Sequence, residues 1–317
     1  MVRIAVAGGS GSIASEIISV LAATGKHKIL ILSRKDTPLT ENLPGVTCIK
    51  TDYDDQRQLA TILNNVHTVL SFVPAHTDPE AVVQKALIDA AIVAGVKRFA
   101  PSEWGTSNFE EMPWYASKAK VRAYLAEINR EKKVLEYSLF QPGGISDCLV
   151  PTGTSTKALS LMPFRIDFLN RRAIVLQGQD SSFTLTTIKD LANVVSRAVE
   201  FEGEWPVVGG VNGTTLPTSR ILETGAKVRG GAPFDITTLK EEDVRAGNIL
   251  SSWIPKIEVP GVPPEQNEYF SKMVFIGSLL SGIHESWVVS NEWNQLLPDY
   301  KFMDVEDFLA KHWSGQP

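Results

Sequence analysis

Short apolar runs alternate with longer segments of helical periodicity through the first half of the chain. The apolar runs predict strands at 2–7, 28–32, 46–50, 67–72, 97–100 and 134–140. The segments between them that carry apolar residues at helical spacing are 12–24, 55–64, 79–94 and 115–130. Because this alternation is typical of βαβ units, we predict an α/β protein built on a doubly wound parallel sheet.

The second half has a different texture, with more Gly, Pro, Thr and Ser after Pro142 and shorter periodic pieces. These pieces are 173–177, 188–201, 218–228, 235–239, 265–281 and 304–313. Segments 188–201 and 205–211 have the patterns of a helix and a strand that return to the first sheet. We therefore predict a first domain of residues 1–150 joined by 186–212. Residues 151–185 and 213–317 would form a smaller α/β domain that binds a substrate.

The first predicted strand runs directly into a glycine turn and a helix. Gly8 permits the tight turn, Gly11 lets backbone N–H groups approach a phosphate, and the small Ala14 lets the helix pack against the strand. The positive end of the helix then faces the negative charge. This arrangement predicts a Rossmann-type dinucleotide site. The cofactor residues expected in this turn are Gly8, Ser10, Gly11, Ser12 and Ile13.

The end of the second predicted strand distinguishes the two nicotinamide dinucleotides. Arg34 stands where an NAD site normally has an acidic residue for the ribose 2′-hydroxyl. A guanidinium pairs with phosphate, so Arg34, with Lys35 as a second cation, predicts NADP(H). The alternative is that both side chains are simply solvated in a loop.

Three further cofactor contacts are expected at the carboxyl ends of the next strands. Asp52 follows the third strand and either accepts a hydrogen bond from the adenine amino group or caps the next helix. Ser71 and Phe72 end the fourth strand, at the edge where ligands of open α/β sheets collect, and should border the cofactor ribose.

The segment after the fifth strand reads Pro-Ser-Glu-Trp-Gly over 101–105, and the next helix carries Lys118. Together with the glycine turn, Arg34 and Gln-Pro-Gly at 141–143, it resembles the isoflavone reductase-like proteins of the NmrA-like branch of atypical short-chain dehydrogenases/reductases. That family has Pro-Ser-Glu-Phe-Gly after the strand, so Trp104 replaces its phenylalanine. The Tyr-x-x-x-Lys pair of the wider superfamily is absent, because Tyr115 precedes Lys118 by three residues.

The resemblance implies hydride transfer from NADPH to an electrophilic carbon of an aromatic, phenolic or polyketide-type metabolite, in an enone, ketone or benzylic ether. It makes Lys118 the catalytic residue, as general acid or base or as an orienting cation, and places Pro142 at the cofactor. Two alternatives stay open, an NADP-binding redox-sensing regulator without turnover and a non-redox isomerase or dehydratase. Lys118 favours the enzyme, because a sensor needs no proton donor beside the nicotinamide. The structural alternative places Lys118, Lys120 and Arg122 on a solvated basic face.

Aromatic residues near these motifs have two interpretations. Trp104, Trp114 and Tyr115 precede the lysine helix, and Phe164 and Phe168 lie in the predicted second domain. They either stack on a small planar aromatic substrate or pack in the core.

Composition narrows the possible partners and compartment. A formal net charge of −5 gives no electrostatic footprint for nucleic acid. Cys48 and Cys148 are too few for a disulfide framework or a cysteine-based zinc site, and the histidines lack metal-ligand spacing. The most apolar later stretch, 273–283, is too short to span a bilayer. We expect a cytoplasmic protein without a metal, a nucleic-acid partner or a membrane partner.

Overall fold

A parallel sheet organises the first half of the molecule in the computed structural model, which describes residues 1–34, 43–156, 159, 164–258 and 262–316. Within these residues the sheet has six strands, in the order β3 (Val46–Lys50), β2 (Lys28–Ser33), β1 (Arg3–Ala7), β4 (Thr68–Ser71), β5 (Arg98–Ala100) and β6 (Glu136–Tyr137). Every neighbouring pair in it runs parallel. The predicted doubly wound α/β fold is therefore confirmed.

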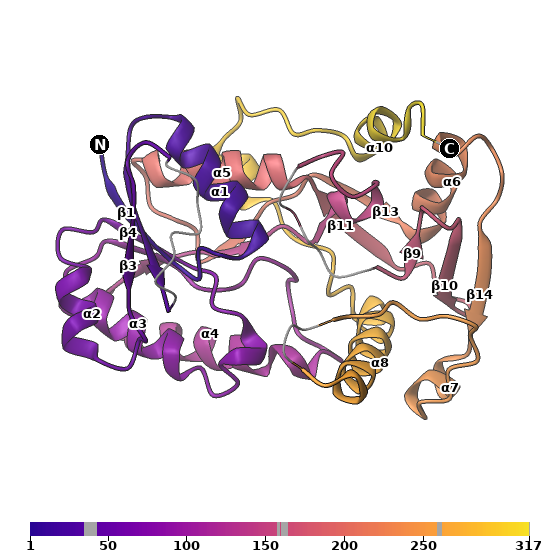
Figure 1. The fold of residues 1–317 in the computed structure, drawn as a ribbon, viewed down its shortest axis with the longest axis horizontal. Helices are drawn as coiled ribbons and strands as arrows, with labels where there is room; N and C mark the ends of the chain where they lie inside the picture. Colours follow the sequence, from indigo (N-terminus) through magenta and orange to yellow (C-terminus); the bar gives the residue numbers. More distant parts are fainter. Residues whose placement is uncertain (35–42, 157–158, 160–163, 259–261, 317) are drawn as a thin grey trace.

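Helices cover both faces of this sheet (Figure 1). One face carries α1 (Ser12–Ala23) and α5 (Ile188–Glu200). The other face carries α2 (Gln56–Ile62), α3 (Val82–Val93) and α4 (Ala116–Ile128).

Side chains of β1 show how the sheet divides the core. Ile4 and Val6 belong to the cluster under α1 and α5, whereas Ala5 and Ala7 belong to the cluster on the opposite face. All four are fully buried. Burial on both faces explains why these strands are continuous apolar runs and not alternating ones.

The last apolar run of the first half, expected as one strand over 134–140, is two strands. After β6 the chain steps at Ser138 into β7 (Leu139–Gln141), which pairs in parallel with β12 (Val208–Gly210). The segment expected to return thus lies beside β7, and α5 packs against α1. The domain limits themselves stay a prediction.

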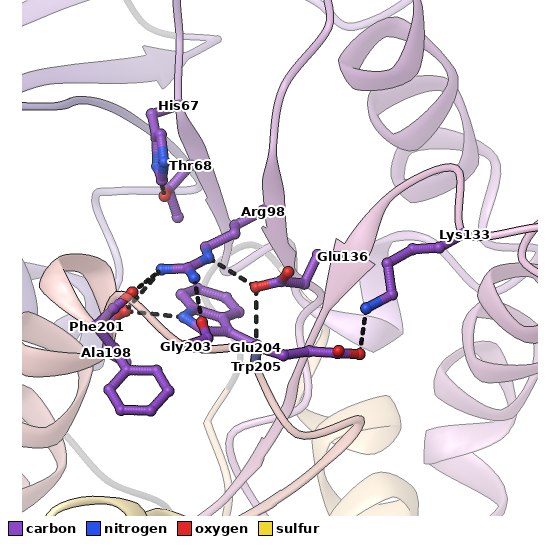
Figure 2. Close-up of polar contacts among 10 residues, drawn as sticks. All are labelled: His67, Thr68, Arg98, Lys133, Glu136, Ala198, Phe201, Gly203, Glu204 and Trp205. Atoms are coloured by element: carbon purple, nitrogen blue, oxygen red, sulfur yellow. Dashed lines mark hydrogen bonds and ion pairs between the residues drawn. The ribbon is translucent and has the colours of Figure 1, made fainter.

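Arg98 ties the returning helix to the main sheet (Figure 2). From β5 its Nε donates to Glu136 of β6 at 2.8 Å. Its two Nη atoms donate to the carbonyl oxygens of Phe201 and Gly203, both at 2.6 Å, just after α5. The guanidinium also lies over the ring of Trp205, whose indole N–H donates to the carbonyl oxygen of Ala198 in α5 at 2.8 Å, so both side chains hold the C-terminal end of α5.

Two small mixed sheets form the second half, on the right in Figure 1. One sheet has the order β14 (Asp235–Leu239), β10 (Arg172–Leu176) and β9 (Ile166–Asp167). The other has the order β13 (Thr214–Pro217), β11 (Ser182–Thr186) and β8 (Gly144–Ile145). The helices here are α6 (Thr218–Val228), α7 (Glu241–Arg245), α8 (Pro264–Leu280), α9 (Glu292–Leu296) and α10 (Val305–Trp313).

Short 3-10 turns complete the elements, at η1 (Ala75–Thr77), η2 (Pro113–Tyr115), η3 (Ser146–Leu149) and η4 (Ser281–His284). In the part of the chain that the structure describes, no helix has both the length and the apolar character needed to cross a membrane.

Candidate functional site

The glycine turn packs directly against the backbone that follows β4. Gly8 has a φ of +74°, and a Cβ placed on it would lie 2.7 Å from the carbonyl oxygen of Phe72. Gly11 is the N-cap of α1, and the described residues supply no side chain that caps this helix. The backbone N–H groups in the first turn of α1 therefore have the arrangement found at helix N-termini that bind anions.

The end of β2 presents Arg34, whose side chain is exposed; Lys35 lies outside the described residues. Asp52 is also exposed, and its carboxylate accepts the N–H of Asp54 at 3.2 Å. The cap of α2 is Asp55, so the helix-capping alternative for Asp52 is wrong.

Tyr53, which sequence reasoning missed, packs against the end of β2. Its hydroxyl donates to the carbonyl oxygen of Leu32 at 2.9 Å, and burial raises its pKa to about 12, so it remains a donor at neutral pH. Its φ of +71° places it in the left-handed region, which its sequence neighbours do not predict.

A buried glutamine joins the end of β4 to the Pro-Ser-Glu-Trp-Gly segment. The amide oxygen of Gln84 accepts the hydroxyl of Ser71 at 3.3 Å and the backbone N–H of Ser102 at 2.9 Å. The Ser71 carbonyl in turn accepts the indole N–H of Trp104 at 2.7 Å, and the Trp104 ring stacks on Phe72 at 4.4 Å. Ser71 and Phe72 therefore hold this segment in place as well as lying beside the glycine turn.

Two basic side chains on adjacent turns of α4 bind the same residue, Glu103. Lys118 is buried, and its Nζ donates to the backbone oxygen of Glu103 at 2.5 Å while lying 3.8 Å from the ring centre of Tyr115. Arg122 binds the Glu103 carboxylate through Nε and Nη2, at 3.1 and 2.7 Å. Lys120 instead pairs with Glu80 at the surface. The solvated-face interpretation thus applies to Lys120 and not to Lys118.

A cavity of about 280 Å³ lies where the start of α1, the segment after β5 and the second half of the chain meet. Residues predicted to bind cofactor or substrate form part of its lining: Ser12, Ile13, Trp104, Trp114, Tyr115 and Phe164. Its volume is slightly below the range of about 300–1,000 Å³ that is typical of ligand pockets. The structure therefore brings the expected cofactor turn and the expected aromatic residues to one space.

The remaining wall was missed by sequence reasoning because it comes from distant segments. It includes Leu185 of β11, Ile257, and Val274 and Phe275 of α8, together with Trp287. The periodic segment 265–281, which predicted α8, was the available signal, but periodicity does not say what a helix faces.

Three of the predicted site residues have structural contacts, in place of or in addition to the predicted ligand contacts. Phe168 does not line the cavity; it is 2% exposed and packs in the core against Phe234 and Trp313. Trp104 reaches the cavity, yet most of its ring lies between Phe72 and Phe140. The carbonyl oxygen of Pro142 accepts the hydroxyl of Thr186 at 2.8 Å.

Polar chemistry in the cavity is sparse. Burial raises the pKa of the Cys148 thiol to about 12, so it stays protonated. Arg165 is the one charged side chain among the described lining residues. Within the described residues there is also no cluster of His, Cys, Asp and Glu that could hold a metal ion.

A wider cleft of about 620 Å³ lies at the opposite edge of the sheet, where the strands begin. His27, His67 and Arg98 are among its lining residues. Ligands of open parallel sheets bind at the carboxyl ends of the strands, so the smaller cavity is the better candidate.

Comparisons with known proteins agree with this architecture. Residues 2–148 match the model of the NmrA-like family. Oxidoreductase BOA1 of Botryotinia fuckeliana is 25% identical over 312 residues, covering 97% of this chain and 100% of that protein. The solved structures "AtPrR2 with NADP+ and (+)pinoresinol" and "Crystal Structure of Isoflavone Reductase" each have a TM-score of 0.70 and 17% identity, covering 98% of both chains, and so share the fold. The resemblance expected from the motifs is confirmed over residues 2–148, which match the NmrA-like family.

Proposed function

We propose that this protein is an NADPH-dependent reductase that transfers hydride to an electrophilic carbon of an aromatic, phenolic or polyketide-type metabolite. The observation that carries the proposal is the cavity itself, which joins Ser12 and Ile13 of the glycine turn to an aromatic wall. Lys118 lies directly behind Tyr115 of that wall. The name of the relative BOA1 and the NADP⁺ and pinoresinol in the AtPrR2 structure support the same chemistry.

The residues at the carboxyl edge of the sheet suit a phosphorylated dinucleotide. Gly8 and Gly11 would hold the pyrophosphate with the first turn of α1, since the N-cap Gly11 has no side chain and forms no side-chain cap hydrogen bond. Arg34 would pair with the 2′-phosphate, because it is exposed at the end of β2 where an NAD site needs a carboxylate. NADPH bound there would supply the hydride.

The remaining cofactor predictions keep their places in this proposal. Asp52 would lie beside the adenine, and Ser71, Phe72 and Pro142 would border the ribose and nicotinamide. Ser10 and Lys35 would add contacts to the phosphates.

We assign Lys118 a role toward an oxygen of the substrate; it is not among the described lining residues, but its Nζ lies 3.8 Å from the ring centre of Tyr115, which is. Its partners, a carbonyl oxygen and the face of Tyr115, are both suited to an ammonium group. In this proposal the lysine donates a proton to the substrate oxygen or orients it. Its burial fixes the amine in one position, which is the condition for efficient proton transfer.

The cavity walls favour a planar, mainly apolar substrate. Trp114, Tyr115, Phe164 and Trp287 offer ring surfaces, and aromatic pairs gain about 0.5–1.5 kcal/mol beyond burial when they stack or meet edge to face. An aromatic ketone, an enone or a benzylic ether fits this lining.

The decisive experiment is calorimetric titration of the purified protein with NADPH and NADH, followed by reduced-nicotinamide absorbance measurements with a panel of aromatic ketones, enones and benzylic ethers. We expect NADPH to bind more tightly than NADH. Arg34→Ala should weaken NADPH much more than NADH, whereas the matched surface variant Arg130→Ala should change neither.

Each outcome separates the candidate functions. Binding followed by oxidation establishes a reductase and identifies its substrate class. Tight NADPH binding without oxidation by any panel compound would favour the regulator or the non-redox enzyme. Failure to bind either dinucleotide would contradict the cofactor site, and equal losses of NADPH and NADH in Arg34→Ala would remove its phosphate role.

A further inference from the structure

Arg165 is a buried cation in the wall of the apolar cavity. It immediately precedes β9 and is only 4% exposed. One Nη donates to the carbonyl oxygen of Ile174 at 3.0 Å, and the other donates to the hydroxyl of Thr218 at 3.3 Å. The guanidinium lies over the ring of Phe183. These contacts hold the group in place but supply no negative charge.

The guanidinium has more donors than its surroundings satisfy. Of its five N–H groups, the described residues accept hydrogen bonds from two, and the buried Nε has no partner among them. Asp180 is the acidic residue whose charge acts on it, but both Asp180 oxygens already accept hydrogen bonds from Ser219. Among the described residues, the side-chain nitrogens of Arg165 donate to a carbonyl and a hydroxyl oxygen and to no carboxylate.

Arg98 shows how this fold satisfies a buried arginine elsewhere. It is 8% exposed, forms an ion pair with Glu136, and donates to three backbone oxygens (Figure 2). Removing an ion from water costs several kcal/mol unless an opposite charge and hydrogen bonds offset it. Arg165 differs from Arg98 in lacking that charge and in lining a cavity.

We infer that Arg165 binds an anionic oxygen of the substrate, a carboxylate or an ionised enol. The inference rests on the proposed function and narrows its substrate class. The substrate would be a planar molecule with one acidic group. A charge-assisted hydrogen bond is roughly twice as strong as a neutral one, and in a cavity with little water the difference is largest. Arg165 would thus set the orientation of the ring system relative to Lys118.

The test is calorimetric titration at pH 7 with matched pairs of probes, with and without NADP⁺. The carboxylate pair is 2-naphthoate and its neutral isostere 2-naphthamide, and the enol pair is 4-hydroxycoumarin and coumarin. We expect at least one anion to bind about tenfold more tightly than its neutral partner. Arg165→Gln should abolish that preference and leave the affinity for the neutral probe within a few-fold.

Arg172→Gln is the matched control, because Arg172 lies on β10 and pairs with Asp167 outside the cavity. This variant should keep the preference for the anion. A preference within the naphthoate pair would indicate a carboxylate substrate, and a preference within the coumarin pair would indicate an enolate.

Equal affinities within both pairs, or no binding of either anion, would overturn the inference. This comparison uses the wild-type protein and does not depend on whether a variant folds. Survival of the preference in Arg165→Gln would overturn it as well. The NADPH titration tests the proposed function separately, so a lost dinucleotide site and a lost anion preference give different results.

Discussion

At the scale of single residues, the position of Lys118 is decided by the segment that it holds. Its Nζ binds the backbone of Glu103, and Arg122 binds the carboxylate of the same residue. The two contacts fix both the lysine and the Pro-Ser-Glu-Trp-Gly segment, so the amine has little freedom beside Tyr115. Sequence reasoning placed Lys118 on the correct helix, but the double grip on Glu103 requires the folded loop.

Lys118→Ala should lower kcat by at least about 10²-fold with any panel compound that the enzyme reduces, the range expected for a lost proton donor. NADPH affinity should remain within a few-fold, because the role proposed for Lys118 is confined to the transition state. Lys120→Ala is the control, since its side chain pairs with Glu80 at the surface. Steady-state kinetics and calorimetry check both, and full activity in Lys118→Ala would remove it from the mechanism.

Gly8 and Gly11 have different structural requirements although both belong to the turn. Gly8→Ala combines a φ of +74° with a Cβ 2.7 Å from the Phe72 oxygen, so the free energy of unfolding should fall by about 1–3 kcal/mol. Gly11→Ala has a φ of −70° and meets its nearest atom at 3.6 Å, so a few tenths of a kcal/mol are expected. Denaturant unfolding of the two variants tests this contrast. Equal effects would contradict it.

At the scale of elements, periodicity located the longer helices and several strands, but not the short helices α7 and α9. The predicted segments 188–201, 218–228 and 304–313 are α5, α6 and α10. Two failures have physical causes. The run 134–140 is continuous in apolar character, yet the chain changes partners at Ser138, which depends on where β12 lies. The strand β11, with the sequence Ser-Phe-Thr-Leu-Thr, lies in a segment rich in Ser and Thr and is stabilised by pairing with β13 and β8.

The candidate site divides in the same way. The glycine turn and the helix of Lys118 follow local rules of turn chemistry and spacing, so sequence could predict them. Phe275, Trp287 and Arg165 reach the cavity from α8 and from loops whose packing is set by the whole second half. Phe164 and Phe168 show the difference most directly, because only Phe164 of the two lines the cavity.

The end of α5 should depend strongly on Arg98. In Arg98→Met the free energy of unfolding should fall by about 3–5 kcal/mol, because Glu136 loses its buried partner and the carbonyl oxygens of Phe201 and Gly203 lose their donors. Arg197→Ala removes an exposed pair with Asp299 and should change the free energy of unfolding much less. Denaturant unfolding compares the two, and NADPH titration should show the same affinity in both. A loss below about 1 kcal/mol for Arg98→Met would contradict the role of Arg98 in holding the end of α5.

At the scale of the whole molecule, the cavity exists because two halves of different architecture meet. The parallel sheet supplies the glycine turn and the lysine helix, and the mixed sheets with α8 supply the apolar wall and Arg165. The family match covers residues 2–148, which hold the expected cofactor residues and Lys118. The part that would decide the substrate lies mainly beyond that match, so substrate choice can change while the cofactor site is kept.

Three histidines make the stability of the molecule depend on pH. Burial is the main cause that lowers the pKa of His27, His67 and His312 below the ordinary value of 6.5. On unfolding each returns to about 6.5, so near and below that pH the unfolded chain binds more protons than the folded one. The histidines should therefore make their full contribution to the free energy of unfolding above about pH 7. That free energy should fall as the pH drops towards about 5. Burial raises the pKa of Asp147, which acts in the opposite direction but through a single group.

Urea unfolding at about pH 7.5 and pH 5.5 measures this dependence, and the midpoint should be lower at the acid pH. His27→Gln gives the sharpest variant, because His27 is 8% exposed and burial is the largest cause that lowers its pKa. Removing it should reduce the difference between the two midpoints, since one fewer group takes up a proton on unfolding. An unchanged difference in His27→Gln would show that His27 does not contribute, and a midpoint that rises towards acid would mean that raised carboxyl pKa values such as that of Asp147 dominate the balance.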